Sequence, residues 1–260
     1  MSFSVSLIGT GNVAWHLAQH FTLLGIDIRE VAGRNQEKTN LFAQQFKAKA
    51  IDHLSHFDQL SDLYIICVSD DQIRNVAQQL AYVQKPILHT SGATPMSIFE
   101  NCMPHFGVLY PLQTFKIQQK VSWEEIPVLI EANNENTFNL VNQLANRMTP
   151  HVHFVNSEQR LKLHTAAVFV SNFVNYLYIT AQDITQSAHL PFSISTPLIQ
   201  EVSNKIKHNN PLETQTGPAI RNDKNVQEKH LALLNSEQKE IYSLLSQLIH
   251  QRFSSENKEK

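Results

Sequence analysis

A glycine-rich turn between an apolar segment and an amphipathic one is the feature that most constrains this chain. Residues 3–8 are mostly apolar, and helical periodicity follows the turn as far as Leu24. In dinucleotide-binding folds the first glycine permits the sharp strand-to-helix turn, the second admits a pyrophosphate, and a small third residue lets the helix pack on the strand. The pattern predicts a nucleotide site, and the alternative is a turn in an unrelated α/β domain. The turn reads Gly9-Thr10-Gly11-Asn12-Val13-Ala14.

Composition narrows the class of protein. The chain has 260 residues, which suits one large or two modest domains, and its net charge of −2 gives no broad attraction to nucleic acid or anionic membranes. No apolar run approaches the roughly 20 residues of a membrane helix, and the first strand begins without a basic leader. We expect a cytoplasmic protein with neither nucleic acid nor membrane as partner. Cys67 and Cys102 have no CxxC neighbour, so we interpret them as packing residues.

Strand and helix patterns alternate over residues 1–155, which is typical of a parallel sheet wrapped by helices. Residues 63–68 have almost no polar interruption, as in a strand covered on both faces. The fold class predicted here is α/β, a Rossmann-type doubly wound and mostly parallel sheet. We expect strands at 4–8, 26–32, 63–68, 87–89, 106–110, 127–131 and 152–155, and helices at 13–24, 36–46, 71–81 and 136–147.

From Ser157 onward the pattern is helical only, which predicts an all-α C-terminal domain over residues 156–253. Residues 254–260 are polar and predicted to be disordered. The expected helices are a long one at 157–187, followed by 197–207, 224–234 and 237–253.

The segment after the second strand discriminates between nucleotides. NAD-binding proteins place an acidic residue there for the ribose 2′-hydroxyl, whereas an Arg accommodates a 2′-phosphate. This chain has Gly33-Arg34-Asn35 and no carboxylate. Arg34 can bind the phosphate through its planar fork, with Asn35 hydrogen-bonding beside it. The segment predicts NADP as the cofactor, and the alternative leaves Arg34 as a solvated loop residue.

Two further strand ends face the same edge of the predicted sheet. Val68, Ser69 and Asp70 follow one strand, where the nicotinamide half of the cofactor would pass, although Asp70 could instead cap the next helix. Ser91 follows the neighbouring strand and is a candidate for orienting a substrate at the hydride-transfer position. The sequence therefore places cofactor and catalytic candidates at one edge.

Four motifs together resemble a family of NADP oxidoreductases. Members join a Rossmann-like domain to a helical C-terminal domain of unknown function, and are related to pyrroline-5-carboxylate reductases, β-hydroxyacid dehydrogenases and deazaflavin-dependent NADP reductases. The resemblance implies NADP binding, a homodimer formed through the helical domain, and an active site for a small-molecule substrate between the domains. The motifs are residues 8–14, 106–115, 163–173 and 216–223.

One departure from these relatives concerns the acid/base. β-Hydroxyacid dehydrogenases carry Lys-x-x-x-Asn on the first long interdomain helix, and matching Asn172 to that Asn places Val168 at the Lys position. His164 is then the acid/base candidate, because imidazole can exchange protons near neutral pH, while Asn172 orients the substrate. At 100° per residue, His164, Ser171 and Asn175 share a stripe on the helix. The alternative is a core histidine, with the amides and hydroxyl bonding across a helix interface.

Three other residues are candidates for substrate binding. Arg221 suits a substrate carboxylate through bidentate hydrogen bonds, whereas the nearby Asp223 could simply cap the following helix. Tyr110 and Gln113 follow a strand and could line a cleft, or could be a buried aromatic and its neighbour. His151 and His153 alternate on a strand without a third ligand at metal-site spacing, so we expect no catalytic metal.

The leading hypothesis is an NADP-dependent oxidoreductase. It would transfer a hydride between NADP(H) and a small, anionic carbonyl or imine compound, with the protein supplying position and a proton. The competing hypothesis is a non-catalytic, NADP-responsive binding protein that relays cofactor occupancy to a partner.

Overall fold

The computed structural model describes residues 3–256. Residues 254–256, part of the predicted disordered tail, belong to the last helix, and residues 257–260 lie outside the described residues. No helix of the described residues is long and apolar enough to cross a membrane.

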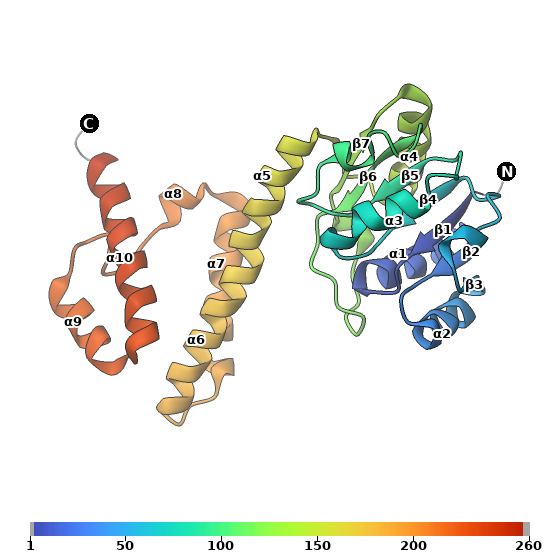
Figure 1. Ribbon diagram of the computed structural model, residues 1–260. Coiled ribbons are helices and arrows are strands. Elements are labelled where there is room, and N and C mark those ends of the chain that lie inside the picture. Colours follow the sequence, from blue (N-terminus) through green and yellow to red (C-terminus); the bar gives the residue numbers. More distant parts are fainter. Residues whose placement is uncertain (1–2, 257–260) are drawn as a thin grey trace. The chain divides into compact units, whose positions relative to one another are not determined.

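Eight strands form one sheet in the order β3-β2-β1-β4-β5-β6-β7-β8 (Figure 1). Neighbouring strands are parallel except β6 and β7, which are antiparallel. This confirms the doubly wound, mostly parallel sheet. The sequence patterns did not reveal β3, because Lys49-Ala50-Ile51 has only one strongly apolar residue, whereas the equally short β5 has Ile87 and Leu88. The strands are β1 (Ser4–Ile8), β2 (Asp27–Ala32), β3 (Lys49–Ile51), β4 (Leu63–Ile66), β5 (Ile87–His89), β6 (Phe106–Pro111), β7 (Val128–Ala132) and β8 (Val152–Phe154).

The predicted helices are present in order, with shifted ends, but the short helix Pro211–Thr214 was not predicted and the one at 157–187 is divided by a π-helical segment. The expected helix at 71–81 is a 3₁₀ turn over Asp70–Gln72 followed by a shorter α-helix. The helices are α1 (Asn12–Leu23), α2 (Gln36–Phe46), α3 (Ile73–Gln79), α4 (Glu135–Met148), α5 (Ser157–Ala167), α6 (Val174–Ser187), α7 (Thr196–His208), α8 (Pro211–Thr214), α9 (Lys224–Leu233) and α10 (Ser236–Glu256).

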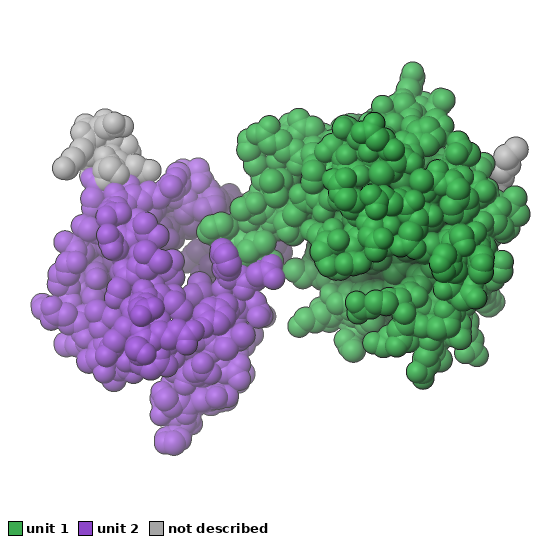
Figure 2. All heavy atoms as spheres, viewed as in Figure 1, with its two compact units in different colours: residues 1–171 green, residues 172–260 purple. Residues whose placement is uncertain are grey.

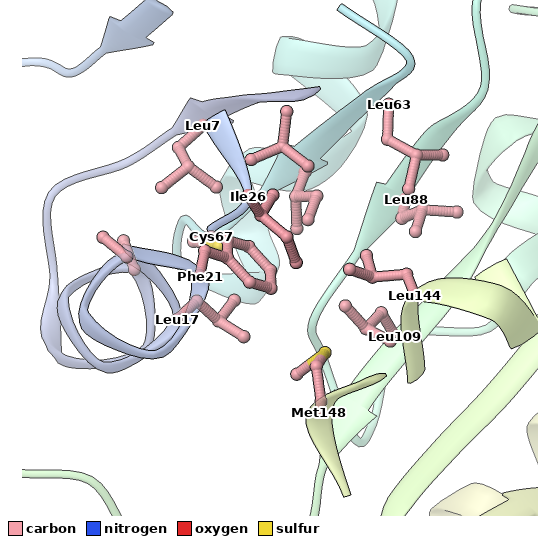
Figure 3. Close-up of a cluster of buried hydrophobic side chains, with 14 of the residues drawn as sticks. Leu7, Leu17, Phe21, Ile26, Leu63, Cys67, Leu88, Leu109, Leu144 and Met148 are labelled. Atoms are coloured by element: carbon pink, nitrogen blue, oxygen red, sulfur yellow. The ribbon is translucent and has the colours of Figure 1, made fainter. Parts of the chain in front are cut away.

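The main core lies between the sheet and the helices α1 and α4 (Figure 3). Leu7 and Leu63 from the strands pack with Phe21 of α1 and Leu144 of α4, and all four are fully buried. Burying a side chain of this size contributes about 1.5–3 kcal/mol. Cys67 lies in the same cluster, where burial raises the pKa of its thiol to about 12, so it is a packing residue as predicted.

The chain forms two compact units, Met1–Ser171 and Asn172–Lys260 (Figure 2). The first includes α5, because Arg160 of this helix is fully buried against it. In the second, Ala219 is the only buried residue among those whose side chains are described. The predicted division at 155/156 follows the change from mixed to helical structure and stays a prediction.

A π-helical segment, Val168–Phe173, connects α5 to α6. The helical stretch therefore extends over 157–187 as expected, but not with uniform α geometry. A π-turn has i→i+5 hydrogen bonds and rotates less per residue than an α-turn. We predicted a shared stripe for His164, Ser171 and Asn175 from a uniform 100° per residue. The π-helical segment lies between His164 and Asn175, so the prediction that they share a stripe is wrong.

Candidate active site

A cavity of about 660 Å³ opens at the carboxyl ends of β1, β2 and β4. Seven of the predicted cofactor-binding residues line it: Gly9, Thr10, Gly11, Arg34, Asn35, Val68 and Ser69. Asn12, Val13, Ala14 and Asp70 do not. The lining also includes residues that sequence reasoning missed, from β3 and the segment after it and from α3: Ile51, Asp52, Leu54, Asn75, Val76 and Gln79.

The glycine turn fits a pyrophosphate. Gly11 is the N-cap of α1 and leaves the helix end without a side-chain hydrogen bond, and the first turn of the helix has no acidic residue. A Cβ at Gly11 would have no atom within 4 Å, so the space beside this backbone is open. Free N–H groups and the positive end of a helix bind phosphate groups. Ala14 is fully buried, as expected of the small residue that lets the helix pack on the strand.

Gly9 is required by its backbone conformation. Its φ is +119°, and a Cβ would lie 2.3 Å from the carbonyl oxygen of Cys67. Only glycine adopts this conformation without strain. The close approach of β1 and β4 at this point therefore depends on Gly9.

The rim of the cavity beyond β2 is cationic. Arg34 and Lys38 both line it and are exposed. The side-chain oxygen of Asn35 accepts a hydrogen bond from the backbone N–H of Lys38 at 2.9 Å and so caps α2. Hydrogen bonds from Ser69 and Gln72, together with the charge of Arg34, lower the pKa of Asp71. Two exposed cations therefore line this end of the cavity, and Asp52 lines it as well.

Tyr110 and His164 form a second polar cluster. The Tyr110 hydroxyl oxygen lies 2.9 Å from His164 Nδ1, and the two rings meet edge to face with centroids 5.8 Å apart. Tyr110 is near the end of β6, and His164 is on α5. Gly92 packs against both, since a Cβ there would lie 2.6 Å from His164 Nδ1 and 2.8 Å from Tyr110 Cζ. The pair therefore has room only because residue 92 has no side chain.

The electrostatics of this pair involve Asp70. Burial, and secondly the negative charge of Asp70, raise the pKa of Tyr110 to about 12, while the charge of Arg160 opposes them. Tyr110 is therefore a neutral phenol at physiological pH. Asp70 directly follows Ser69, a cavity residue, so the pair lies toward the same edge of the sheet as the cavity.

Ser91 and His89 stabilise the turn that carries Gly92. The Ser91 hydroxyl accepts hydrogen bonds from the backbone of Ala93 and Thr94 at 3.1 and 2.9 Å, and donates to the Thr94 hydroxyl at 3.0 Å. Nδ1 of His89 accepts from the Ser91 N–H at 3.1 Å. Burial, and secondly the charge of Arg160, lower the pKa of His89 to about 3. Both side chains are engaged in the structure of the turn.

The remaining candidates belong to other segments of the chain. Gln113 is exposed, and its side-chain oxygen accepts from the Thr114 N–H at 2.8 Å. Asn172 and Arg221 belong to the second unit, where both are exposed. Asp223 caps α9 by accepting from the Val226 N–H at 3.2 Å. Among residues 3–256, no group of three or more His, Cys, Asp or Glu side chains could hold a metal ion.

Two family models match the chain. Residues 4–89 match the family described as NADP oxidoreductase, coenzyme F420-dependent, and residues 126–249 match a domain of unknown function, DUF2520. A provisionally named NADP oxidoreductase from Bacteroides fragilis is 35% identical over 96% of this chain and 98% of that one, with a TM-score of 0.90. The chain belongs to this NADP oxidoreductase family.

Two more distant structures share the fold. A pyrroline-5-carboxylate reductase from Coxiella burnetii is 15% identical, with 98% of each chain covered and a TM-score of 0.62. A reductive aminase from Aspergillus terreus, in complex with NADPH and ethyl-5-oxohexanoate, is 14% identical over 98% of this NADP oxidoreductase and 95% of the aminase, with a TM-score of 0.72. A comparison with curated proteins gave no match. These findings confirm the family that the sequence motifs indicate.

Proposed function

We propose that this oxidoreductase binds NADP(H) in the cavity beside Gly11 and transfers a hydride to or from a small carbonyl or imine compound, with His164 as the acid/base. The observation that carries the proposal is the hydrogen-bonded pair of Tyr110 and His164. The Tyr110 hydroxyl holds the His164 imidazole in one orientation. A group that exchanges protons with a substrate needs such a fixed position. Asp70, whose negative charge raises the pKa of Tyr110, directly follows the cavity residue Ser69.

Cofactor selection depends on Arg34. The exposed guanidinium at the cavity rim can bind a 2′-phosphate in a bidentate manner, and Lys38 adds a second positive charge. The first turn of α1 binds the pyrophosphate through its N–H groups. This arrangement supports a preference for NADPH over NADH.

The protein moves the proton. When bound, the nicotinamide group supplies or takes up the hydride. In the direction of reduction, protonated His164 gives the proton on Nε2 to the carbonyl oxygen or imine nitrogen as that atom gains negative charge. The ring is then neutral and keeps its proton on Nδ1, which donates to the Tyr110 oxygen in this state as it does in the charged ring. In the other neutral tautomer, with the proton on Nε2, the Tyr110 hydroxyl donates to Nδ1 instead. Tyr110 can therefore hold the ring in either charge state, because a hydroxyl both donates and accepts.

Substrate recognition involves two residues of the second unit. The exposed guanidinium of Arg221 is suited to bind a carboxylate through bidentate hydrogen bonds, and the Asn172 amide is suited to orient the reacting group. The engaged hydroxyl of Ser91 favours a role in shaping the Gly92 turn over direct contact with substrate. A small keto acid or an imino acid is the substrate class that matches these residues.

The apolar surface of the second unit supports a homodimer. On α7, Leu198 is 67% exposed, Val202 50% and Ile206 49%, and the three lie on one face of the helix. A helical unit with a single buried residue among its described side chains lacks a core of its own. A second copy of the chain would supply the missing apolar surface.

Calorimetric titration with NADPH and NADH, followed by a turnover screen with small keto acids and cyclic imines, tests the proposal. We expect selective binding of NADPH, retained in His164→Asn, and reductive turnover that this variant loses. Selective binding without turnover of any compound would favour the NADP-responsive binding protein. Absence of binding would overturn the proposed function.

A further inference from the structure

We propose that Glu131, Ser157 and Arg160, named here the Arg160 cluster, position His164 against Tyr110 and Gly92. The three are positioning residues, because they act through His164 rather than on a substrate. The inference rests on the proposed function, in which His164 is the acid/base. It concerns a buried charged group that cofactor binding and proton transfer do not use.

Arg160 connects three parts of the first unit. Its guanidinium is fully buried, pairs with the Glu131 carboxylate on β7, and donates through Nη2 to the Thr94 carbonyl at 2.6 Å. The Ser157 hydroxyl donates to Glu131 at 2.8 Å and accepts from the Met96 N–H at 2.9 Å. Helix α5, strand β7 and the segment 94–96 are therefore held together by charge-assisted hydrogen bonds, which are stronger than neutral ones.

The cluster and the Tyr110–His164 pair form two successive contacts between α5 and the sheet. Glu131 is paired with Val108 of β6, two residues before Tyr110. Cross-strand partners and residues two apart share a face, so Glu131 and Tyr110 lie on the same face, roughly 7 Å apart along the strand. Arg160 and His164 are one helical turn apart, about 6 Å. Fixing the first contact therefore fixes the place of the second.

The same cluster holds the turn that carries Gly92. Arg160 binds the carbonyl of Thr94, and Ser157 binds the N–H of Met96, on the C-terminal side of Gly92. The Gly92 backbone in turn packs on His164 and Tyr110. The imidazole thus contacts Tyr110 of β6, whose neighbouring strand β7 is bound by Arg160, and it packs on a turn that Arg160 also binds.

Stability alone does not account for a buried ion pair at this place. Desolvation offsets much of the attraction between buried charges, and apolar residues of similar volume often stabilise a fold equally well. Directional hydrogen bonds from one guanidinium to a carboxylate and a carbonyl fix an orientation that apolar contacts do not. Among charged groups, Arg160 and Asp70 act on Tyr110 with opposite sign, and Arg160 also acts on His89.

The test compares two double variants on the same helix. Glu131→Leu/Arg160→Met replaces the buried pair by apolar residues of similar size. Glu158→Leu/Lys162→Met does the same to the exposed pair of α5, whose charged atoms are 2.6 Å apart and whose side chains are 74% exposed. The readout is the ¹⁵N spectrum of the His164 ring in the substrate-free protein, at a pH where the ring is neutral, assigned with His164→Asn.

We expect wild type and the exposed-pair variant to show one tautomer, with the proton on Nε2 and Nδ1 accepting from Tyr110. In the buried-pair variant, the ¹⁵N spectrum should instead show a mixture of the two neutral tautomers of His164, because the ring is no longer held in one orientation. Its NADPH affinity should stay within twofold of wild type. Ser157→Ala is a milder change, and it should shift only part of the His164 population to the other tautomer. This variant keeps the test valid if the double variant does not fold. An unchanged His164 spectrum in the buried-pair variant or in Ser157→Ala would overturn the inference. Failure of the proposed function would be seen in a different measurement, because the wild-type protein would then show neither NADPH binding nor turnover.

Discussion

Nδ1 of His164 and the hydroxyl oxygen of Tyr110 lie 2.9 Å apart, although 54 residues separate them in the sequence. A similar pair occurs in the second unit, where Nδ1 of His230 lies 2.8 Å from the Tyr242 hydroxyl and the rings again meet edge to face. The two pairs differ in their surroundings, since His164 is half-buried against the sheet domain and His230 is exposed. The second pair therefore provides a matched control for the first.

Tyr110→Phe removes only the hydroxyl of the catalytic pair. We expect NADPH affinity to stay within twofold and reductive turnover to fall by about 100-fold, because an acid/base group typically contributes 10²–10⁴ and depends on its orienting partner. Tyr242→Phe makes the same change in the control pair and should leave turnover unchanged. Steady-state kinetics on the first active compound of the screen would measure both, and equal effects of the two variants would contradict the role of Tyr110.

Gly92→Ala should disturb the pair without touching its members. The new Cβ would meet His164 Nδ1 at 2.6 Å and Tyr110 Cζ at 2.8 Å, so the rings or the turn must move. Overpacking of this kind costs about 1–3 kcal/mol of unfolding free energy. Urea unfolding followed by tryptophan fluorescence reports on this unit, because Trp15 and Trp123 both belong to it.

Gly11→Ala is the comparison for that substitution. Its Cβ would meet no atom within 4 Å, so we expect a stability change below about 1 kcal/mol together with weaker NADPH binding. A loss of stability at Gly11 as large as at Gly92 would show that the open space beside α1 is not as described.

Local patterns predicted the parts of the site that adjacent residues build. The glycine turn, the strand before it and Arg34 after β2 all lie within the first 34 residues, and each has a steric or electrostatic signature. Strand β3 was missed because Lys49-Ala50-Ile51 lacks an apolar run, and the cavity residues Asp52 and Leu54 were missed with it.

Long-range contacts could not be predicted in the same way. The antiparallel register that places Glu131 beside Val108 depends on how the whole chain folds, and no local signal marks Arg160 as buried. The prediction for Ser91 considered its position after a strand but not its competing use within a turn, where serine often bonds its own backbone. The predicted stripe on the long helix was wrong because it assumed uniform α-helical geometry, whereas residues 168–173 are π-helical.

Arg34→Asp tests cofactor selectivity. The substitution removes the bidentate partner of a 2′-phosphate and adds a repelling charge, so we expect NADPH affinity to fall by about 100-fold and NADH affinity to change by less than about threefold. Arg74→Asp is the control, because Arg74 is exposed on α3 but does not line the cavity. Calorimetric titration with both nucleotides measures the ratio, and equal weakening of the two would remove the role assigned to Arg34.

His89 should make the first unit sensitive to acid. Its pKa falls from 6.5 to about 3 on folding, so the unfolded chain binds a proton below pH 6.5 that the folded protein takes up only near pH 3. Stability from this group is present above pH 6.5 and is lost as the pH falls, by about 2 kcal/mol between pH 7.5 and 5.0. In His89→Asn the amide oxygen can still accept a hydrogen bond from the Ser91 N–H. The variant has no imidazole to protonate, so the loss of unfolding free energy that His89 causes between pH 7.5 and 5.0 should disappear.

Urea unfolding at the two pH values, followed by tryptophan fluorescence, measures the difference. His208→Asn, at an exposed position of α7, should keep the wild-type dependence. If His89→Asn loses as much stability between pH 7.5 and 5.0 as wild type does, other groups control the acid sensitivity.

Val202→Glu should separate the proposed homodimer. Val202 is 50% exposed at the middle of the apolar face of α7, between Leu198 and Ile206, and a carboxylate there would have to be desolvated between two copies of the chain. Gln200→Glu adds the same charge about 200° around the helix and should leave the assembly intact. Sedimentation velocity at 10 μM would show a dimer for wild type and Gln200→Glu and a monomer for Val202→Glu. A monomeric wild type would contradict the homodimer, whereas a dimeric Val202→Glu would show that the interface lies on a face other than that of α7.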